Sequence, residues 1–179
     1  DVADRLSRIY RYIMVDEYQD TNRLQAEIIR SLAHAHDNVM AVGDDAQSIY
    51  SFRGATVRNI FEFPDLFPGT RVIKLEENYR STQPILDLSN EIILQAKEHY
   101  TKNLFTKKET GFQPTLIEAD NERYQSRFVT QKILELREEG VPLTEIAVLF
   151  RSSFHSFDLE LELNRCNLPF VKRGGFKFI

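Results

Sequence analysis

The apolar run Tyr12-Ile13-Met14-Val15 ends directly in two carboxylates, Asp16 and Glu17, and this junction constrains the fold more than any other feature of the chain. The run predicts a short buried strand. Two adjacent acids at the carboxyl end of such a strand lie where open α/β sheets bind ligands, so one acid could hold a divalent cation while its neighbour polarises a water. The alternative is an acidic strand-to-helix turn, in which Asp20 or Thr21 caps the next helix.

Further apolar runs, bounded by turn residues and helix breakers, predict more strands along the chain. The expected strands are residues 12–15, 39–42, 71–75, 115–119, 146–150 and 168–171. Amphipathic spacing and caps predict helices at 3–11, 21–35, 121–139 and 154–165. A further helix is expected to end at Phe63, and another is expected to begin at a cap formed by Ser81 or Thr82. Strands that alternate with helices predict an α/β fold with a mostly parallel sheet covered on both faces.

The spacing of apolar residues also predicts which face of each helix is buried. The expected buried residues are Leu24, Ile28, Ile29, Leu32, Tyr124, Phe128, Val129, Ile133, Leu136, Phe154, Phe157 and Leu161.

Composition narrows the class of protein. The 179 residues suffice for one domain or two small lobes, and 42% hydrophobic with 28% charged residues describes a globular chain. We expect no membrane span, because no apolar run is long enough, and one cysteine, Cys166, fits a reducing cytoplasm rather than a disulfide framework. With a net charge of −4, a DNA site would have to be local. The chain opens inside an expected helix without methionine, so we expect a piece of a longer protein.

Three segments carry the chemistry: VDEYQDTN at 15–22, VGDDAQSIYSFRGA at 42–55 and LEENYRST at 75–82. In this order and spacing they resemble the second, third and fourth motifs of the UvrD/PcrA/Rep family of superfamily 1 DNA helicases. Residues 146–179 also resemble the second RecA-like domain of that family, up to where a large insertion normally begins. The resemblance implies parts of two adjacent RecA-like domains of the P-loop NTPase type. Residues 1–74 would be the C-terminal part of the first domain, and 75–179 the N-terminal part of the second.

The resemblance implies an ATP site that uses Mg²⁺. Asp16 would help to hold the metal, and Glu17 would be the base that orients the attacking water. Gln47 would sense the γ-phosphate. Tyr79 would stack on adenine, while Arg80 would reach the γ-phosphate from the second domain. Phosphoryl transfer depends on positioning and charge compensation, which suits this set of residues.

Structural alternatives remain open for several of these residues. Gln19 and Asp20 could make turn and cap hydrogen bonds. Gln47 could be a solvated turn amide, and Arg80 could form a surface ion pair beside a capped helix. For the acids at 44–45 we expect a structural turn rather than metal binding.

The same resemblance implies contacts with single-stranded DNA. Tyr50 and Phe52 match an aromatic pair that stacks on bases, and Arg53 matches an arginine that meets the phosphate backbone. Stacking on aromatics tolerates any base, as a translocating motor requires. Arg151 keeps its match and could meet a phosphate, whereas Ser153 departs from the asparagine usual in the family and takes no role.

Outside these positions we expect structural roles. Of the apolar residues near Tyr50, Ile49 best fits a core position, and Asn78 is expected to shape its loop. Residues 97–114, rich in lysine and threonine, are expected to form a surface loop, and the histidines show no metal-ligand spacing. The cluster Lys172, Arg173 and Lys177 is expected to be a solvated tail.

No GxxxxGK[ST] segment occurs in this sequence, so we expect the isolated chain not to hydrolyse ATP. Three functions stay open. The first is a fragment of an ATP-driven helicase that moves on single-stranded DNA, 3′ to 5′ as is usual for the family, and unwinds duplex junctions in repair, replication or recombination. The second is a truncated or degenerate relative that binds DNA or a protein partner without turnover. The third is a metal-dependent hydrolase that uses Asp16 and Glu17 without DNA. Oligomeric state is not predicted.

Overall fold

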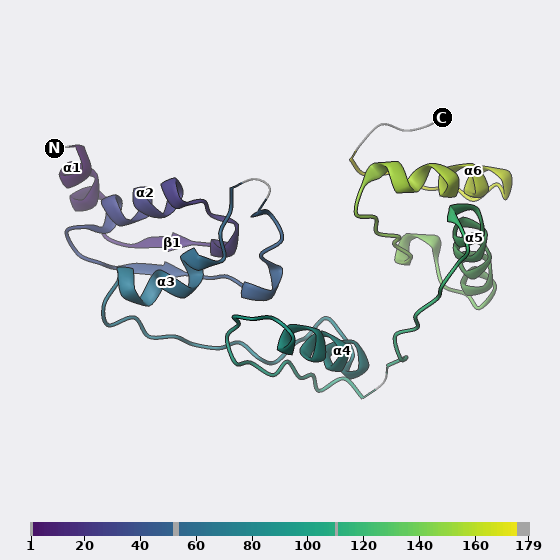
Figure 1. The fold of residues 1–179 in the computed structure, drawn as a ribbon, viewed down its shortest axis with the longest axis horizontal. Helices are drawn as coiled ribbons and strands as arrows, with labels where there is room; N and C mark the ends of the chain where they lie inside the picture. The colour runs from purple at the N-terminus through teal and green to yellow at the C-terminus, as the bar shows by residue number, and fades with distance from the viewer. Residues whose placement is uncertain (1, 52–53, 110, 175–179) are drawn as a thin grey trace. The chain divides into compact units, whose positions relative to one another are not determined.

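The chain forms two compact units, Asp1–Pro114 and Thr115–Ile179 (Figure 1). The structure is a computed structural model that describes residues 2–51, 54–109 and 111–174. This division falls after residue 114, whereas the resemblance to the helicase family implies a domain boundary after residue 74. The difference has a physical cause, because side chains and backbone of the segment near residues 100–102 bond to Asp44, Asp45 and Ile60 in the same unit.

The first unit contains the two strands predicted nearest the N-terminus. Helix α1 (Val2–Ile9) precedes β1 (Ile13–Val15), and α2 (Arg23–Ala33) connects β1 to β2 (Val39–Ala41). The strands pair in parallel, with Ile13, Met14 and Val15 opposite Val39, Met40 and Ala41. The predicted parallel pairing of these two strands is therefore confirmed.

Helix α2 begins with a capping box rather than with the cap expected from sequence. The side chain of Asn22 accepts a hydrogen bond from the N–H of Gln25, and the Gln25 side chain accepts one from the N–H of Asn22. This reciprocal pair satisfies two backbone donors at the start of the helix. The expectation that Asp20 or Thr21 caps the helix is wrong, because Thr21 instead donates its hydroxyl to the carbonyl of Tyr18.

One face of the sheet carries the core of this unit. Tyr18 packs edge-on against Phe63, with ring centroids 5.3 Å apart, and Phe67 continues the cluster from just beyond α3 (Arg58–Leu66). The opposite face carries Met14 and Met40, which are exposed and border a cavity of about 920 Å³. The expectation of a sheet covered on both faces is therefore wrong within residues 2–51, 54–109 and 111–174.

Helix α3 does not end at Phe63 as predicted but continues through Pro64 to Leu66. A proline inside a helix leaves the carbonyl four residues earlier without its usual donor, here the carbonyl of Ile60. The hydroxyl of Tyr100 donates to that carbonyl at 3.2 Å. This bond offsets the loss, and Tyr100 lies beyond α4 (Gln83–Leu94).

The second unit is helical. Helix α5 (Glu122–Glu138), capped by Asn121, lies within a residue of its predicted bounds and packs against α6 (Phe157–Arg165). Two short 3₁₀ helices, η4 (Leu143–Glu145) and η5 (Ser153–Ser156), lie between them. The core of this unit is formed by Ile133, Leu159, Leu163 and Leu168.

Several helical faces differ from those predicted. Residues expected to be buried but exposed are Leu24, Ile28, Tyr124, Phe128, Phe154 and Leu161. In α5 the buried residues are Ser126, Thr130 and Ile133, so the packed face is rotated from the most apolar one. No helix within the described residues is long and apolar enough to cross a membrane.

Four predicted strands, at 71–75, 115–119, 146–150 and 168–171, form no strand in the structure. Apart from β1 and β2, the described residues pair only in isolated bridges, Asn22 with Ala55 and Glu77 with Phe105. A strand exists only where a neighbouring backbone supplies ladder partners, and no described segment does so here. These four predictions are wrong for this structure.

We expect Phe63→Ala to lower the free energy of unfolding by about 3 to 5 kcal/mol, because the lost ring leaves a cavity beside Tyr18 and Phe67. Urea unfolding followed by circular dichroism measures this value. Phe112→Ala is the matched control, since Phe112 is exposed, and it should change the value by less than about 0.5 kcal/mol. Equal effects of both substitutions would contradict the assignment of this core.

Candidate functional site

Both strands of the sheet end in acidic residues at the same edge. β1 is followed directly by Asp16 and Glu17, and β2 is followed, after Val42 and Gly43, by Asp44 and Asp45. Because the strands are parallel and Val15 lies opposite Ala41, the two acid pairs leave the sheet side by side. Two further backbone bonds extend this pairing, from the N–H of Val42 to Val15 and from the N–H of Tyr18 to Val42.

The side chain of Gln19 connects the two strand ends. It lies in η1 (Tyr18–Asp20) and is 1% exposed. Its amide nitrogen donates to Glu17 Oε2 at 2.6 Å, and its amide oxygen accepts from the backbone N–H of Asp44 at 3.0 Å. Gly43 leaves room for this amide, because a Cβ there would lie 2.8 Å from its oxygen. Gln19 therefore connects the two strand ends in addition to making a hydrogen bond within its own turn.

Asp16 and Glu17 present exposed carboxylates at this edge. Asp16 Oδ1 accepts from the N–H of Glu17, and Glu17 has a left-handed backbone with φ 51° and ψ 44°. Within the described part of the chain, no lysine or arginine pairs with either carboxylate. The described residues also contain no group of three or more His, Cys, Asp and Glu that could hold a metal ion. One free carboxylate still fits Mg²⁺, which commonly binds one or two carboxylates together with water and phosphate oxygens.

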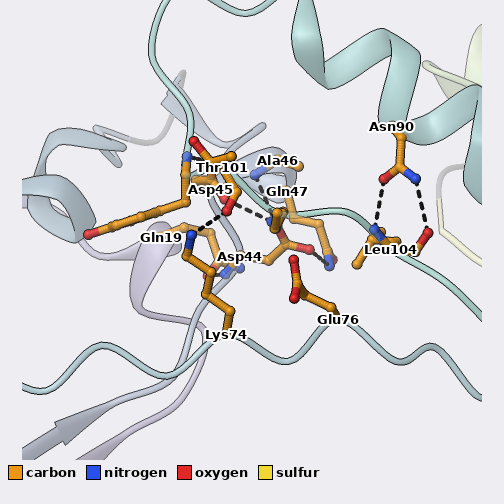
Figure 2. A network of polar contacts seen from close by, with 12 residues as sticks. Gln19, Asp44, Asp45, Ala46, Gln47, Lys74, Glu76, Asn90, Thr101 and Leu104 are labelled. Atoms are coloured by element: carbon orange, nitrogen blue, oxygen red, sulfur yellow. Dashed lines mark hydrogen bonds and ion pairs between the residues drawn. The ribbon is translucent and has the colours of Figure 1, made fainter.

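Asp44 holds Gln47 in place (Figure 2). Asp44 caps η2 (Asp45–Gln47) through a bond from the N–H of Ala46 to Oδ1, which confirms the structural turn expected for this acid. Its Oδ2 accepts from the Gln47 side-chain amide at 2.8 Å. Gln47 is exposed to solvent but has a fixed partner. Together with Gln19, these bonds form a continuous path from Glu17 to Gln47.

Lys102 forms ion pairs with both acids of the second pair. Its ammonium group donates to Asp44 Oδ1 and, at 2.8 Å, to Asp45 Oδ1. Burial raises the pKa of Asp44, but hydrogen bonds from Lys102 and Gln47 outweigh it and hold that pKa below its ordinary 3.8. Burial lowers the pKa of Lys102, and its bonds to Asp44 and Asp45 more than reverse this, so the pKa lies above 10.5. Asp44 and Lys102 are therefore both charged at neutral pH.

The loop that carries Tyr79 and Arg80 is shaped by Asn78, as predicted. Asn78 Oδ1 accepts from the N–H groups of Arg80 and Ser81 at 2.9 and 2.7 Å. Thr82 occupies the N-cap position of α4 without a side-chain cap bond. Tyr79 and Arg80 are exposed, and no described carboxylate forms an ion pair with Arg80. The surface ion-pair alternative for Arg80 is therefore not observed.

The residues predicted to contact DNA are only partly described. Tyr50 is half-buried, and Phe52 and Arg53 lie outside the described residues. Ile49 is 66% exposed, so its expected place in the core is wrong. Arg151 is exposed and belongs to the second unit, next to η5.

Lys172 was expected in a solvated tail, and this is wrong. Its ammonium group bonds to Glu160 at 2.6 Å, and both side chains are nearly buried. Ser156 donates to the same carboxylate, and Lys172 also lies over the ring of Phe157. Lysine in this position supports α6 rather than facing solvent.

Comparison with known families covers almost the whole chain. Residues 1–68 match the UvrD/REP helicase N-terminal domain, and residues 73–179 match the UvrD-like helicase C-terminal domain. The chain belongs to the UvrD-like helicase family. Within this UvrD-like chain, Asp16, Glu17 and Gln47 lie in the first match, while Tyr79, Arg80, Lys102 and Arg151 lie in the second.

Individual relatives agree with this assignment. The chain is 40% identical to proteins named ATP-dependent DNA helicase PcrA from Leuconostoc citreum and from Bacillus subtilis, over 99% of its length. It is 41% identical to a protein named DNA helicase II from Haemophilus influenzae, also over 99%. In each case the UvrD-like chain spans 24% of the relative.

We expect the left-handed backbone at Glu17 to strain the folded state. Glu17→Gly should therefore be more stable than Glu17→Ala by about 1 kcal/mol, because glycine adopts this conformation without a Cβ penalty. Chemical unfolding of the two variants measures the difference. Gln131, inside α5, is the control position, where alanine should instead be the more stable by about 1 kcal/mol. The same order at both positions would contradict strain at Glu17.

We expect Asp44 to make stability depend on pH in acid. Because its pKa is lower in the folded state, its contribution is fully present above pH 3.8 and is lost as pH falls through the lowered pKa. Wild type should exceed Asp44→Asn in urea midpoint at pH 7, and the gap should close as pH falls below 3.8. Asp120→Asn, at an exposed acid, should show little gap at either pH. A gap that widened in acid would refute the charged pairing of Asp44.

Proposed function

We propose that this chain is part of an ATP-dependent DNA helicase that couples ATP hydrolysis to movement on single-stranded DNA. The observation that carries the proposal is the bonded path at one sheet edge, from Glu17 through Gln19 and Asp44 to Gln47. It connects an acid pair that has no cation partner among the described residues to an oriented amide, which suits a site that holds a phosphate chain and an attacking water. The names of the relatives support the reaction.

In this proposal each strand end has its own task. Asp16 would hold Mg²⁺, and Glu17 would accept a proton from the attacking water as general base. Gln47 would contact the γ-phosphate, with its amide held by Asp44. Mg²⁺, when bound, would neutralise charge on the phosphate oxygens. The exposure of Asp16 and Glu17, with no described cation beside them, is what leaves them able to do this.

We further propose that residues 1–74 and 75–179 belong to two RecA-like domains. The boundary between the two family matches, 1–68 and 73–179, supports this division, and the parallel pair β1 and β2 supports the fold of the first domain. Tyr79 would stack on adenine, and Arg80 would compensate charge at the γ-phosphate. Arginine supplied by a second domain makes hydrolysis depend on domain closure.

The DNA contacts proposed are those of Tyr50, Phe52, Arg53 and Arg151. Base stacking and phosphate contacts of this kind bind single strands without regard to sequence. The partners would be single-stranded DNA and duplex junctions, with movement 3′ to 5′, in the cytoplasm. Relatives named DNA helicases support binding to DNA in general.

The test uses the longest open reading frame that contains this chain. We expect ATP hydrolysis that single-stranded DNA stimulates, and we expect Glu17→Gln to lower kcat by about 10² to 10⁴-fold while ATP and DNA still bind. Glu138→Gln, at an exposed acid on α5, is the matched control and should leave kcat unchanged. The isolated 179-residue chain should release no phosphate above background.

Other outcomes identify other functions. DNA binding without hydrolysis by the long protein would indicate a binding module and overturn the proposal. Metal-dependent hydrolysis that DNA does not stimulate, at a rate that Tyr50→Ala with Phe52→Ala leaves unchanged, would indicate a hydrolase without a DNA role.

A further inference from the structure

The segment from Tyr100 to Lys108, here called the strap, lies within the surface loop expected at residues 97–114, and it is held in place by hydrogen bonds. It follows α4 and bonds along its length to two separate parts of the first unit. At its beginning, the N–H of Tyr100 donates to Asp45 Oδ2 at 2.8 Å. The carbonyl of Thr101 accepts a bond from the ammonium group of Lys74.

Lys102 is the central residue of the strap. Its side chain is 14% exposed, and the Asp45 side chain beside it is 4% exposed. A lysine this buried is stable as a cation only because both carboxylates accept hydrogen bonds from it. Each acid has another fixed partner, Gln47 for Asp44 and the N–H of Tyr100 for Asp45.

The far end of the strap supports the loop that carries Tyr79 and Arg80. The N–H of Phe105 donates to the carbonyl of Glu76, and the N–H of Asn78 donates to the carbonyl of Phe105. Lys108 donates to the carbonyl of Arg80 at 2.7 Å. The strap therefore connects the acids after β2 with the loop before α4, and Figure 2 shows the contact of its Leu104 with Asn90.

We propose that Lys102 is a positioning residue for ATP hydrolysis: by binding Asp44 and Asp45 together, it fixes the carboxylate that orients Gln47 and ties that orientation to the strap. The inference rests on the proposed function. It goes beyond it by giving a role to a residue outside the three motifs, on a segment that also holds the Tyr79–Arg80 loop. Lys102 itself touches neither ATP nor DNA in this proposal.

Removal of the ammonium group would leave two neighbouring carboxylates with no cation between them. Asp44 would lose the Lys102 hydrogen bond that fixes its carboxylate, so it would turn toward water and release the Gln47 amide. Repulsion between Asp44 and Asp45 would separately lower the stability of the fold. A misplaced γ-phosphate contact slows the chemical step more than it weakens ATP binding. The expected signature is a fall in kcat with a nearly constant KM for ATP.

The experiment compares Lys102→Met with the double variant Lys102→Met, Asp45→Asn in the long protein. Methionine keeps the length of the side chain, and the amide oxygen introduced by Asp45→Asn would still accept from the N–H of Tyr100. We expect Lys102→Met to lower kcat by about 10 to 100-fold, with KM changed by less than about threefold. In the double variant the melting temperature should recover, because the cluster regains its wild-type net charge. The kcat should stay low, because the Lys102 hydrogen bond to Asp44 is still missing. Lys132→Met, at an exposed lysine on α5, is the matched control and should change neither.

Hydrogen exchange at the backbone amides of Ala46 and Gln47 provides a reading that needs no ATP hydrolysis. Both Lys102 variants should speed exchange there by about tenfold or more, because the Asp44 cap is released. If the long protein has no ATPase activity, the proposed function fails, and unchanged exchange would separately overturn the role of Lys102. With activity present, recovery of kcat together with melting temperature in the double variant would show a purely structural role and overturn the proposal.

Discussion

The buried amide of Gln19 is the contact on which the arrangement of the site depends. A primary amide without solvent must find partners for both its nitrogen and its oxygen, and here they come from different strand ends, Glu17 and the backbone of Asp44. The backbone can approach this closely only because residue 43 is glycine. Two acid pairs that lie outside the strands are thereby kept in register, as if the sheet extended past β1 and β2.

The acids at this edge divide into two electrostatic classes because one lysine reaches only one pair. Lys102 lies 57 and 58 residues from Asp45 and Asp44, and it forms ion pairs with both. Asp16 and Glu17 stay exposed, with no described cation beside them. A metal ion with its phosphates would therefore meet Asp16 and Glu17 as the pair without a cation partner among the described residues. Asp44 and Asp45 already bond to Lys102, and they also hold Gln47 and the N–H of Tyr100.

Sequence predicted what depends on local pattern and missed what depends on distant partners. β1, β2 and α5 follow from apolar runs and a cap, and the position of Asp16 and Glu17 at the sheet edge follows from the strand that ends beside them. Residues 146–150 have an equally apolar run but form no strand, because pairing needs a neighbour that sequence does not supply. Helical spacing placed Phe154 and Phe128 on buried faces, yet the side of a helix that is covered is set by its partner. Lys102 had no signal at all, since it stands in a polar stretch without periodicity.

The contact between Tyr100 and Ile60 shows how the strap could become part of this unit. Pro64 removes the donor that would satisfy the carbonyl of Ile60 inside α3, and the Tyr100 hydroxyl takes its place. Phe61, next to Ile60, also packs against the Tyr100 ring, with centroids 5.3 Å apart. Tyr100, two residues before Lys102, therefore anchors the strap to α3 through the carbonyl that Pro64 leaves without a helical donor. The ammonium group of Lys102 then starts from a fixed backbone, which lowers the entropy lost when it is held between two acids.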